Sequence, residues 1–304
     1  MGAEWACDLS KYTCAKDAQA DAQKWESISP DKKWAAFVKK YNLYLRNIST
    51  GEVVELTHDG ARAWDYATPL PSARQMVEQG TENVRERPAV FWAPDSSKLI
   101  TYRIDSRFVG RFTTLQFAPP DQLRPKAFTY AYPLPGESLS KAEPIIFHVP
   151  SGKRINVQTD PLELQFLGGP GFDWFKDSKR IHYDFRSRGE KSVEFRVIDA
   201  ETGKERAVVR EESATYVDPG ENFIEVVNDG EEILWASERD GWNQIYLYNG
   251  KTGELENQVT KGPWVVRGIE HVDEKGRVVY FRACGREPGE DPYLAHLYKI
   301  NFDG

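Results

Sequence analysis

The sequence predicts an all-β fold of propeller type, with about five recognisable four-stranded blades. Three observations carry this prediction. A turn that contains aspartate and leads into an alternating strand occurs five times, a turn that contains glycine follows each copy, and a further alternating strand lies between the two turns. Units of about 40–50 residues with four strands each are typical of propeller blades.

The aspartate turn is the first repeated element. Its five copies are SPDKKWAAFV, APDSSKLITYR, FKDSKRIHYDFR, VNDGEEILWAS and VDEKGRVVYFR. Their aligned aspartates are Asp31, Asp95, Asp177, Asp229 and Asp273. Apolar and polar residues alternate after each turn, which is the pattern of a half-buried strand. The second unit is the longest, and long loops between Asp105 and Glu143 account for its length.

The glycine turn is the second repeated element. Hairpin turns often need a positive φ, which glycine adopts without steric cost. Strands between the two turns are expected over residues 42–48, 193–199, 244–250 and 296–302. The turn glycines are Gly51, Gly152, Gly203, Gly253 and Gly304.

The remaining segments complete the expected organisation. Residues 17–25 and 72–82 are each compatible with a short helix, and 61–88 carry little alternation, which indicates a non-blade insertion. Residues 4–9 and 13–15 resemble the third and fourth strands of another blade, whereas the fifth unit lacks its fourth strand. We therefore expect residues 1–304 to form a single propeller fragment that begins inside one blade and ends inside another.

Composition excludes several classes of partner. The 40 Lys and Arg and 47 Asp and Glu give a net charge of −7, which lacks the basic field that a phosphate backbone attracts. No apolar run approaches the ~18 residues of a membrane helix. Nucleic acid and a membrane segment are therefore not expected, and no signal peptide is visible.

Catalytic and metal-binding motifs are absent from the sequence. There is no Gly-x-Ser-x-Gly nucleophile elbow, no His-Glu-x-x-His and no Cys-x-x-Cys. We expect no catalytic residue, no metal site and no cofactor in this chain.

Glu78, Glu82 and Glu86 are the candidate binding residues. Their spacing puts them on one face if the segment is helical. Converging carboxylates hold a cation such as the α-amino group of a peptide. The alternative is a solvated face, neutralised by nearby arginines. These are Arg74, Arg85 and Arg87.

Cys7 and Cys14 are a candidate disulfide pair. They would face each other across the proposed N-terminal hairpin, where a cross-strand pair reaches disulfide distance. A disulfide would imply an oxidising compartment. The alternative is two reduced thiols.

Several phrases resemble the N-terminal propeller region of dipeptidyl peptidase IV-type serine peptidases, of the prolyl oligopeptidase family. They include FWAPDSSKLITYRIDSR, YAYPLPGE, ASERDGWNQIYLYN and VTKGPWVVRGIE, and the resemblance runs from about Trp5 to Gly304. It implies an eight-bladed propeller joined to a C-terminal α/β-hydrolase domain with a Ser-Asp-His triad, a domain that this chain does not contain. The resemblance further implies that the propeller covers the active site and admits only short or unfolded peptides.

The resemblance also implies a binding site for the substrate. In the family a Glu-Glu pair on a propeller insertion, shortly before a Trp-Ser-Pro turn, binds the free N-terminus of the peptide. The matching turn here is Trp92-Ala93-Pro94, but no Glu-Glu dipeptide precedes it. Glu82 is the best single match, with Glu86 and Glu78 as substitutes.

We therefore expect a propeller that gates and recognises peptide N-termini for a serine exopeptidase and has no activity alone. The alternatives are a non-catalytic protein-binding scaffold and, less well supported, a propeller glycosidase, which needs a carboxylate pair across a central funnel. Expected partners are peptides with a free N-terminus and the α/β-hydrolase domain of the full-length protein, and a homodimer is left open. An exported or periplasmic location is favoured.

Overall fold

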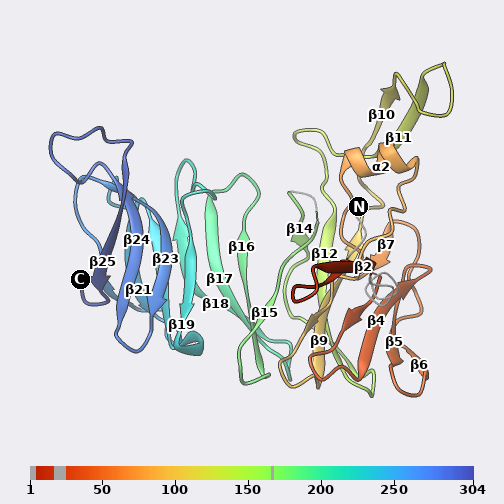
Figure 1. Cartoon of the computed structure of the whole chain (residues 1–304), viewed down its shortest axis with the longest axis horizontal. Coiled ribbons are helices and arrows are strands. Elements are labelled where there is room, and N and C mark those ends of the chain that lie inside the picture. The colour runs from red at the N-terminus through yellow and green to blue at the C-terminus, as the bar shows by residue number, and fades with distance from the viewer. Residues whose placement is uncertain (1–4, 17–24, 166–167) are drawn as a thin grey trace. The chain divides into compact units, whose positions relative to one another are not determined.

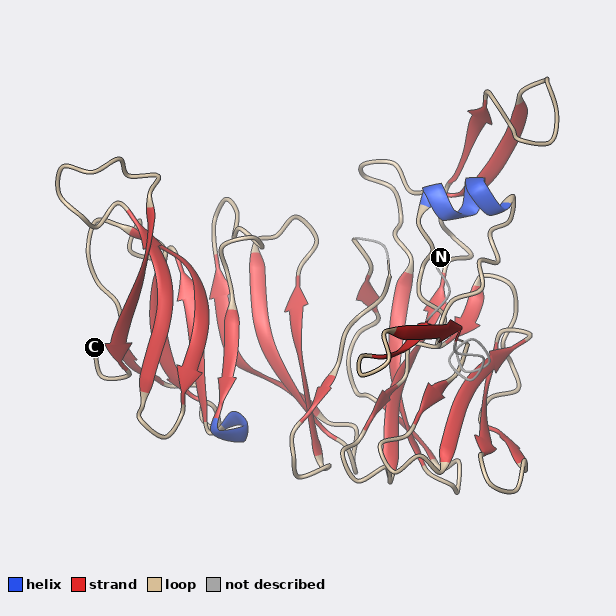
Figure 2. Cartoon of the chain, in the orientation of Figure 1, coloured by secondary structure: helices blue, strands red, loops and turns tan. Residues whose placement is uncertain are grey.

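The computed structural model describes residues 5–16, 25–165 and 168–304, and these residues form mainly antiparallel β-sheets (Figure 2). They divide into two compact units. The first holds Met1–Lys179 with Asp199–Lys204, and the second holds Arg180–Ile198 with Glu205–Gly304. Within the described residues, each of the five predicted repeats contributes the strands of one antiparallel sheet, so the predicted blade pattern is confirmed.

The first sheet of the first unit is a four-stranded meander in sequence order. Its strands are β3 (Ser27–Ile28), β4 (Trp34–Lys39), β5 (Asn42–Asn47) and β6 (Val53–Glu55). Leu43 and Leu45 of β5 are fully buried, and they share one core with Leu99 and Phe147 of the next sheet. The alternation seen in the sequence thus marks the face that packs between sheets.

The second sheet has the order β13-β12-β9-β7, with β8 paired to β9 and β14 paired to β12. Its strands are β7 (Trp64–Tyr66), β8 (Phe91–Trp92), β9 (Lys98–Asp105), β12 (Lys141–His148), β13 (Arg154–Asn156) and β14 (Leu162–Glu163). The prediction of a non-blade insertion over 61–88 needs a correction here, because β7 lies inside that range and pairs with β9. The strand β15 (Asp173–Trp174) is the last of this unit.

A short helix and a hairpin extend from the second sheet (Figure 1). The helix α2 (Ala73–Gln79) begins at the predicted Ser72, whose side chain accepts from the N–H of Gln75 in a capping box. It ends earlier than residue 82 because Gly80 adopts a left-handed conformation with φ of 64°. The other predicted helix, 17–25, lies outside the described residues except for Trp25.

The hairpin consists of β10 (Arg111–Gln116) and β11 (Lys126–Ala131), within the segment expected as long loops. Met76 of α2 packs with Tyr130 and Phe128 of β11 and with Val84. The helix therefore rests on the base of the hairpin.

The second unit contains three runs of neighbouring strands. The first run is β16 (Arg180–Arg186), β17 (Ser192–Asp199) and β18 (Glu205–Glu212). The second is β19 (Ile224–Val227), β20 (Glu232–Ser237), β21 (Gln244–Asn249) and β22 (Leu255–Gln258). The third is β23 (Val265–Asp273), β24 (Val278–Cys284) and β25 (Ala295–Asn301), a three-stranded sheet as predicted for the fifth repeat. The core of this unit includes Leu234, Ile245, Val279 and Phe281.

Glycine and aspartate recur in the turns of the repeats for different structural reasons. Gly51 and Gly253 have φ angles of 75° and 77° as predicted, and a Cβ on Gly253 would lie 1.9 Å from the carbonyl oxygen of Val208. The side chain of Asp31 accepts from the N–H of Lys33 at 3.1 Å. In the same way Asp95 accepts from the N–H of Ser97, and Asp177 accepts from the N–H of Lys179. This contact forms an Asx turn, in which aspartate is favoured.

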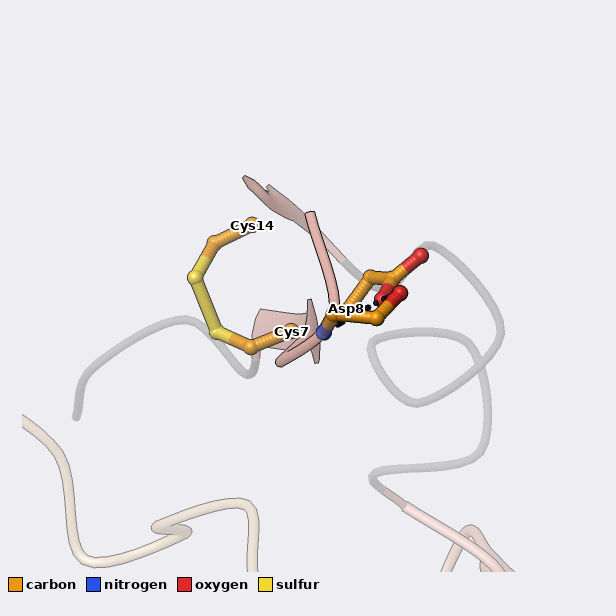
Figure 3. The surroundings of a disulfide bond; sticks show 4 residues. Cys7, Asp8 and Cys14 are labelled. Carbon is orange, nitrogen blue, oxygen red and sulfur yellow. Dashed lines mark hydrogen bonds between the residues drawn. A yellow bond between two sulfur atoms is a disulfide. The ribbon is translucent and has the colours of Figure 1, made fainter. Parts of the chain in front are cut away.

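The N-terminal hairpin consists of β1 (Trp5–Asp8) and β2 (Thr13–Lys16), which among the described strands pair only with each other. Cys7 stands opposite Cys14 in the register, and a disulfide joins them with their Cα atoms 4.1 Å apart (Figure 3). The carboxylate of Asp8 accepts from the N–H of Ser10 at 2.9 Å and stabilises the turn. Cys284 is a buried free thiol.

Candidate functional site

The first unit contains a pocket of about 920 Å³. Its wall comes from the segment around β7, from α2 and the residues after it, from the loop that follows β9, and from the base of the hairpin β10–β11. Glu82 lines this pocket, whereas the other two predicted glutamates, Glu78 and Glu86, do not belong to its wall.

Glu82 connects the pocket wall to the hairpin. One carboxylate oxygen accepts from the backbone N–H of Ala131 at 2.8 Å, and the other accepts from Arg111 at 3.1 Å and from Arg62. Arg111 and Ala131 stand opposite each other at the base of the hairpin. The carboxylate of Glu82 therefore binds both strands of the hairpin, at the opposed residues Arg111 and Ala131 where the two strands first pair.

These donors keep Glu82 ionised. Burial raises the pKa of the carboxyl group, but the hydrogen bonds from Arg111, from the N–H of Ala131 and from Arg62 outweigh it and hold the pKa below its usual range. Glu82 is thus an anion whose charge is already matched by two cations of this chain.

Glu78 and Glu86 have separate partners. Glu78 accepts from Arg74 at 2.8 Å, four residues away on α2, and its side chain is 59% exposed. Glu86 accepts from the side-chain amide of Gln75 at 2.6 Å. Because the helix ends at Gln79, the three glutamates do not share a helical face.

The arginines that neutralise Glu82 differ from those expected. Arg85 lies over the ring of Trp25, 4.7 Å from its centroid, and Arg74 pairs with Glu78. The cations that bind Glu82 are Arg62 and Arg111, which lie 20 and 29 residues away in sequence. No local spacing connects them to Glu82, because the fold of the hairpin brings them together.

Asp65, which is not among the residues expected from the sequence, also lines the pocket. It is the central residue of β7, between Trp64 and the fully buried Tyr66. Burial raises the pKa of its carboxyl group to about 7. The alternation Trp-Asp-Tyr was the available signal, since it places an acidic residue on the face opposite two aromatic side chains.

The second unit has a smaller pocket of about 490 Å³ with several carboxylates in its wall. The most engaged is Glu211, which accepts from the indole N–H of Trp235 at 2.6 Å, from Ser237 at 2.7 Å and from Arg239 at 3.1 Å. Its carboxylate oxygens therefore already accept hydrogen bonds from side chains of β20 and of the loop that follows it.

The described part of the chain contains no group of three or more His, Cys, Asp or Glu side chains arranged to hold a metal ion. None of its helices combines the length and the apolar character that crossing a membrane requires.

Comparison with known proteins decides the family. The model of the dipeptidyl peptidase IV (DPP IV) N-terminal region matches residues 2–304. The chain belongs to this family. The chain is similar to the probable dipeptidyl-aminopeptidase B of Ajellomyces dermatitidis, with 24% identity over 100% of this chain and 34% of that protein. It is also similar to dipeptidyl peptidase 4 of Arthroderma otae, with 26% identity over 95% of this chain and 36% of that protein.

Solved structures support the same fold. The crystal structure of Porphyromonas gingivalis dipeptidyl peptidase 4 matches with a TM-score of 0.67 and 19% identity, over 98% of this chain and 40% of that chain. A putative dipeptidyl aminopeptidase IV of Bacteroides ovatus matches with a TM-score of 0.61 and 20% identity, over 91% of this chain and 38% of that chain. The predicted all-β propeller-type fold is confirmed. The chain spans about a third of the length of the two dipeptidyl peptidase relatives named above.

Proposed function

We propose that this chain is the substrate-recognition region of a dipeptidyl peptidase IV-like serine exopeptidase. In this role it gates access to an active site carried by an α/β-hydrolase domain of the full-length protein and receives peptides with a free N-terminus. It performs no hydrolysis alone, because a serine mechanism needs a nucleophile, a base and an oxyanion hole together.

The observation that carries the proposal is the pocket of the first unit. A volume of about 920 Å³ suits a short peptide segment, since ligand pockets commonly range from about 300 to 1,000 Å³. Carboxylates of Asp65 and Glu82 belong to its wall, and an anionic group is what a protonated amine requires. Family membership supports the same role, since the relatives are named dipeptidyl peptidases and aminopeptidases.

Within this proposal Glu82 has a defined position. Of the three predicted glutamates it alone lines the pocket, so a peptide that enters passes its carboxylate. Its two arginine partners leave it a weak ligand for a further cation, and its main effect is to hold the hairpin at the pocket wall.

A peptidase assay tests the proposal. The substrate is a peptide with a free N-terminus, and the control is the same peptide acetylated at its N-terminus. The full-length protein is expected to release an N-terminal dipeptide from the first and not from the second, and the 304-residue chain releases nothing from either. Turnover by the chain alone that survives repurification, or equal cleavage of both peptides, would contradict the proposal.

One observation favours the alternative of a protein-binding scaffold. The hairpin β10–β11 and its flanking loops expose large apolar side chains to solvent. These are Phe108, Phe112, Leu115, Phe117 and Leu123. Exposed apolar clusters often mark protein contacts. A full-length protein that shows no peptidase activity but forms a stable complex through this hairpin would support the alternative.

A further inference from the structure

The pocket of about 490 Å³ in the second unit has an acidic wall. The wall comes from the end of β18 and the loop that follows it, from the end of β20 and the residues after it, and from Asn243 just before β21. Five of the wall side chains are carboxylates and one, Arg239, is a cation. A ligand that enters this pocket therefore meets a field of net negative charge.

Three of the five carboxylates already have arginine partners. These pairs are Glu211 with Arg239, Glu212 with Arg210, and Glu221 with Arg267. Arg239 also donates to the hydroxyl groups of Ser237 and Tyr248. The cation of the wall is thus neutralised and held by its own unit, and it does not offset the two remaining carboxylates.

Asp218 and Glu238 are the two carboxylates without a cation. Among the described residues, the side chain of Asp218 accepts from the N–H of Gly220 at 2.8 Å and has no ion pair, and the carboxylate of Glu238 has neither a hydrogen bond nor an ion pair. They belong to different segments of the wall, since Asp218 lies in the loop after β18 and Glu238 directly follows β20. Two negative charges therefore line the pocket without a counter-charge.

Asn243 gives independent evidence that the pocket lacks a ligand. It lines the pocket and is only 1% exposed. Its Nδ2 donates to the carbonyl oxygens of Glu221 at 2.8 Å and Val266 at 3.0 Å, so both amide hydrogens have acceptors and the orientation of the amide is fixed. Its Oδ1 is buried and receives no hydrogen bond from the described residues. Because a buried acceptor without a donor is unfavourable, a ligand with N–H donors would stabilise this wall.

The wall sets three requirements for the ligand. It must carry positive charge for Asp218 and Glu238, it must present several N–H donors, and it must fit beside Tyr216, an exposed aromatic residue of the wall. The guanidinium group of arginine meets all three, because it is always charged, holds its N–H donors in one plane and stacks on aromatic rings. An ammonium group is a compact, strongly hydrated charge and fits a flat ring less well.

We propose that this pocket binds the side chain of an arginine residue in a peptide, with Asp218 and Glu238 as its counter-charges and Oδ1 of Asn243 as a hydrogen-bond acceptor. The volume lies within the range of about 300 to 1,000 Å³ that is common for ligand pockets. The inference goes beyond the proposed function and does not rest on it, because no free α-amino group takes part and all wall residues belong to the second unit. An arginine bound here anchors a peptide by a side chain rather than by its terminus.

Calorimetric titration of the 304-residue chain tests the assignment. The probe is acetyl-Ala-Arg-Ala amide, in which the acetyl group removes the α-amine, and two comparison peptides carry citrulline or lysine in place of the arginine. Citrulline has nearly the shape of arginine but no charge. The wild type is expected to prefer the arginine peptide at least about tenfold over the citrulline peptide, the factor that corresponds to one charge-assisted hydrogen bond, and about threefold over the lysine peptide.

A double variant and a matched control show whether the two carboxylates cause this preference. The double variant combines Asp218→Asn with Glu238→Gln, which keeps the size of both side chains and removes both charges. Its preference for arginine over citrulline is expected to fall below about threefold. The control is Glu254→Gln, because Glu254 is an exposed glutamate of the same unit that lies outside the pocket wall and has no ion pair among the described residues. The control should keep the preference of the wild type.

The side-chain amide of Asn243 provides a readout that needs no variant. Its NMR signal should shift when the arginine peptide is added and stay in place with the citrulline peptide, and an unmoved signal would refute the role of Asn243.

Several results would overturn the assignment. They are equal or absent binding of the arginine and citrulline peptides by the wild type, a preference that survives in the double variant, and a preference that is also lost in the control. Equal affinity for the lysine peptide would refute guanidinium as the group recognised. Because all three probes are acetylated, none of these results decides the proposed function.

Discussion

The hydroxyl of Ser96 accepts a hydrogen bond from the backbone N–H of Asp31 at 3.1 Å. Ser178 repeats this contact with the N–H of Asp95 at 3.2 Å. In both cases the serine directly follows the turn aspartate of the next repeat, and both serines are buried, with exposures of 5% and 3%. The Asp-Ser pair in the turn thus forms an Asx turn within one repeat and a link to the repeat before it.

Replacement of Ser96 by alanine is expected to lower the free energy of unfolding by about 1 kcal/mol, because the N–H of Asp31 loses its acceptor. Urea denaturation measures the difference. Ser151→Ala is the matched control, since Ser151 is an exposed turn serine of the same unit, and its effect should stay within about 0.5 kcal/mol. Equal stability of the two variants would show that the link contributes nothing.

Glu82→Gln is expected to loosen the base of the hairpin β10–β11. The variant loses two ion pairs, and at neutral pH we expect a destabilisation of about 1–3 kcal/mol. The lowered pKa of Glu82 stabilises the folded state above the unfolded value of 4.5, so the difference from wild type shrinks as the pH falls through and below that value. Amide hydrogen exchange at Ala131 measures the opening.

Glu78→Gln is the control for this experiment. It removes the same charge from an exposed pair on α2, whose contribution is about 0.3–0.5 kcal/mol. Exchange at Ala131 should not change in this variant. If both variants accelerate exchange equally, the effect is one of net charge and the clamp by Glu82 is refuted.

Asp65→Asn is expected to stabilise the unliganded chain increasingly as the pH rises. Between the unfolded value of 3.8 and about 7, the folded wild type binds a proton that the unfolded chain releases, so its stability falls with rising pH in this window. Asparagine does not titrate. The difference in Tm between variant and wild type should therefore widen from pH 5 to pH 8, whereas Asp160→Asn, at an exposed aspartate of the same unit outside the pocket wall, should show no such trend. A constant difference for Asp65→Asn would mean that the carboxyl group is fully solvated.

The thiol count tests the proposed N-terminal disulfide. The sequence has 3 cysteines, and the structure pairs Cys7 with Cys14. Thiol titration of the unfolded chain should find one thiol, from Cys284, before reduction and three after it. Three thiols without a reductant would favour the alternative of reduced cysteines. Since β1 and β2 pair only with each other among the described strands, reduction should leave peptide affinity unchanged.

Local signals explain which parts of the fold were predictable. The positive φ of Gly51 and the Asx turn of Asp31 are set by the chemistry of single residues, and the strands of half-buried sheets alternate visibly in the sequence. The hairpin β10–β11 lacks that signal, because among the described strands its two strands pair only with each other, and they stay largely exposed. The sequence pattern therefore does not distinguish this hairpin from the long loops expected between Asp105 and Glu143.

The candidate site was less predictable for a related reason. The position of Glu82 before Trp92-Ala93-Pro94 identifies it in the sequence, but its partners Arg62 and Arg111 depend on contacts that only the folded hairpin creates. Asp65 is distinguished by what it lacks, a partner within the described pocket wall, and sequence spacing does not report such an absence.

A structure of the chain with bound Leu-Ala-Ala amide tests the central claim most directly. The account predicts that the peptide lies in the pocket of the first unit, with its amino nitrogen within about 3.2 Å of a carboxylate oxygen of the pocket wall, from Asp65 or Glu82, and its leucine side chain against the apolar part of the wall. A peptide bound outside this pocket, or bound in it with its amine in solvent, would contradict the account.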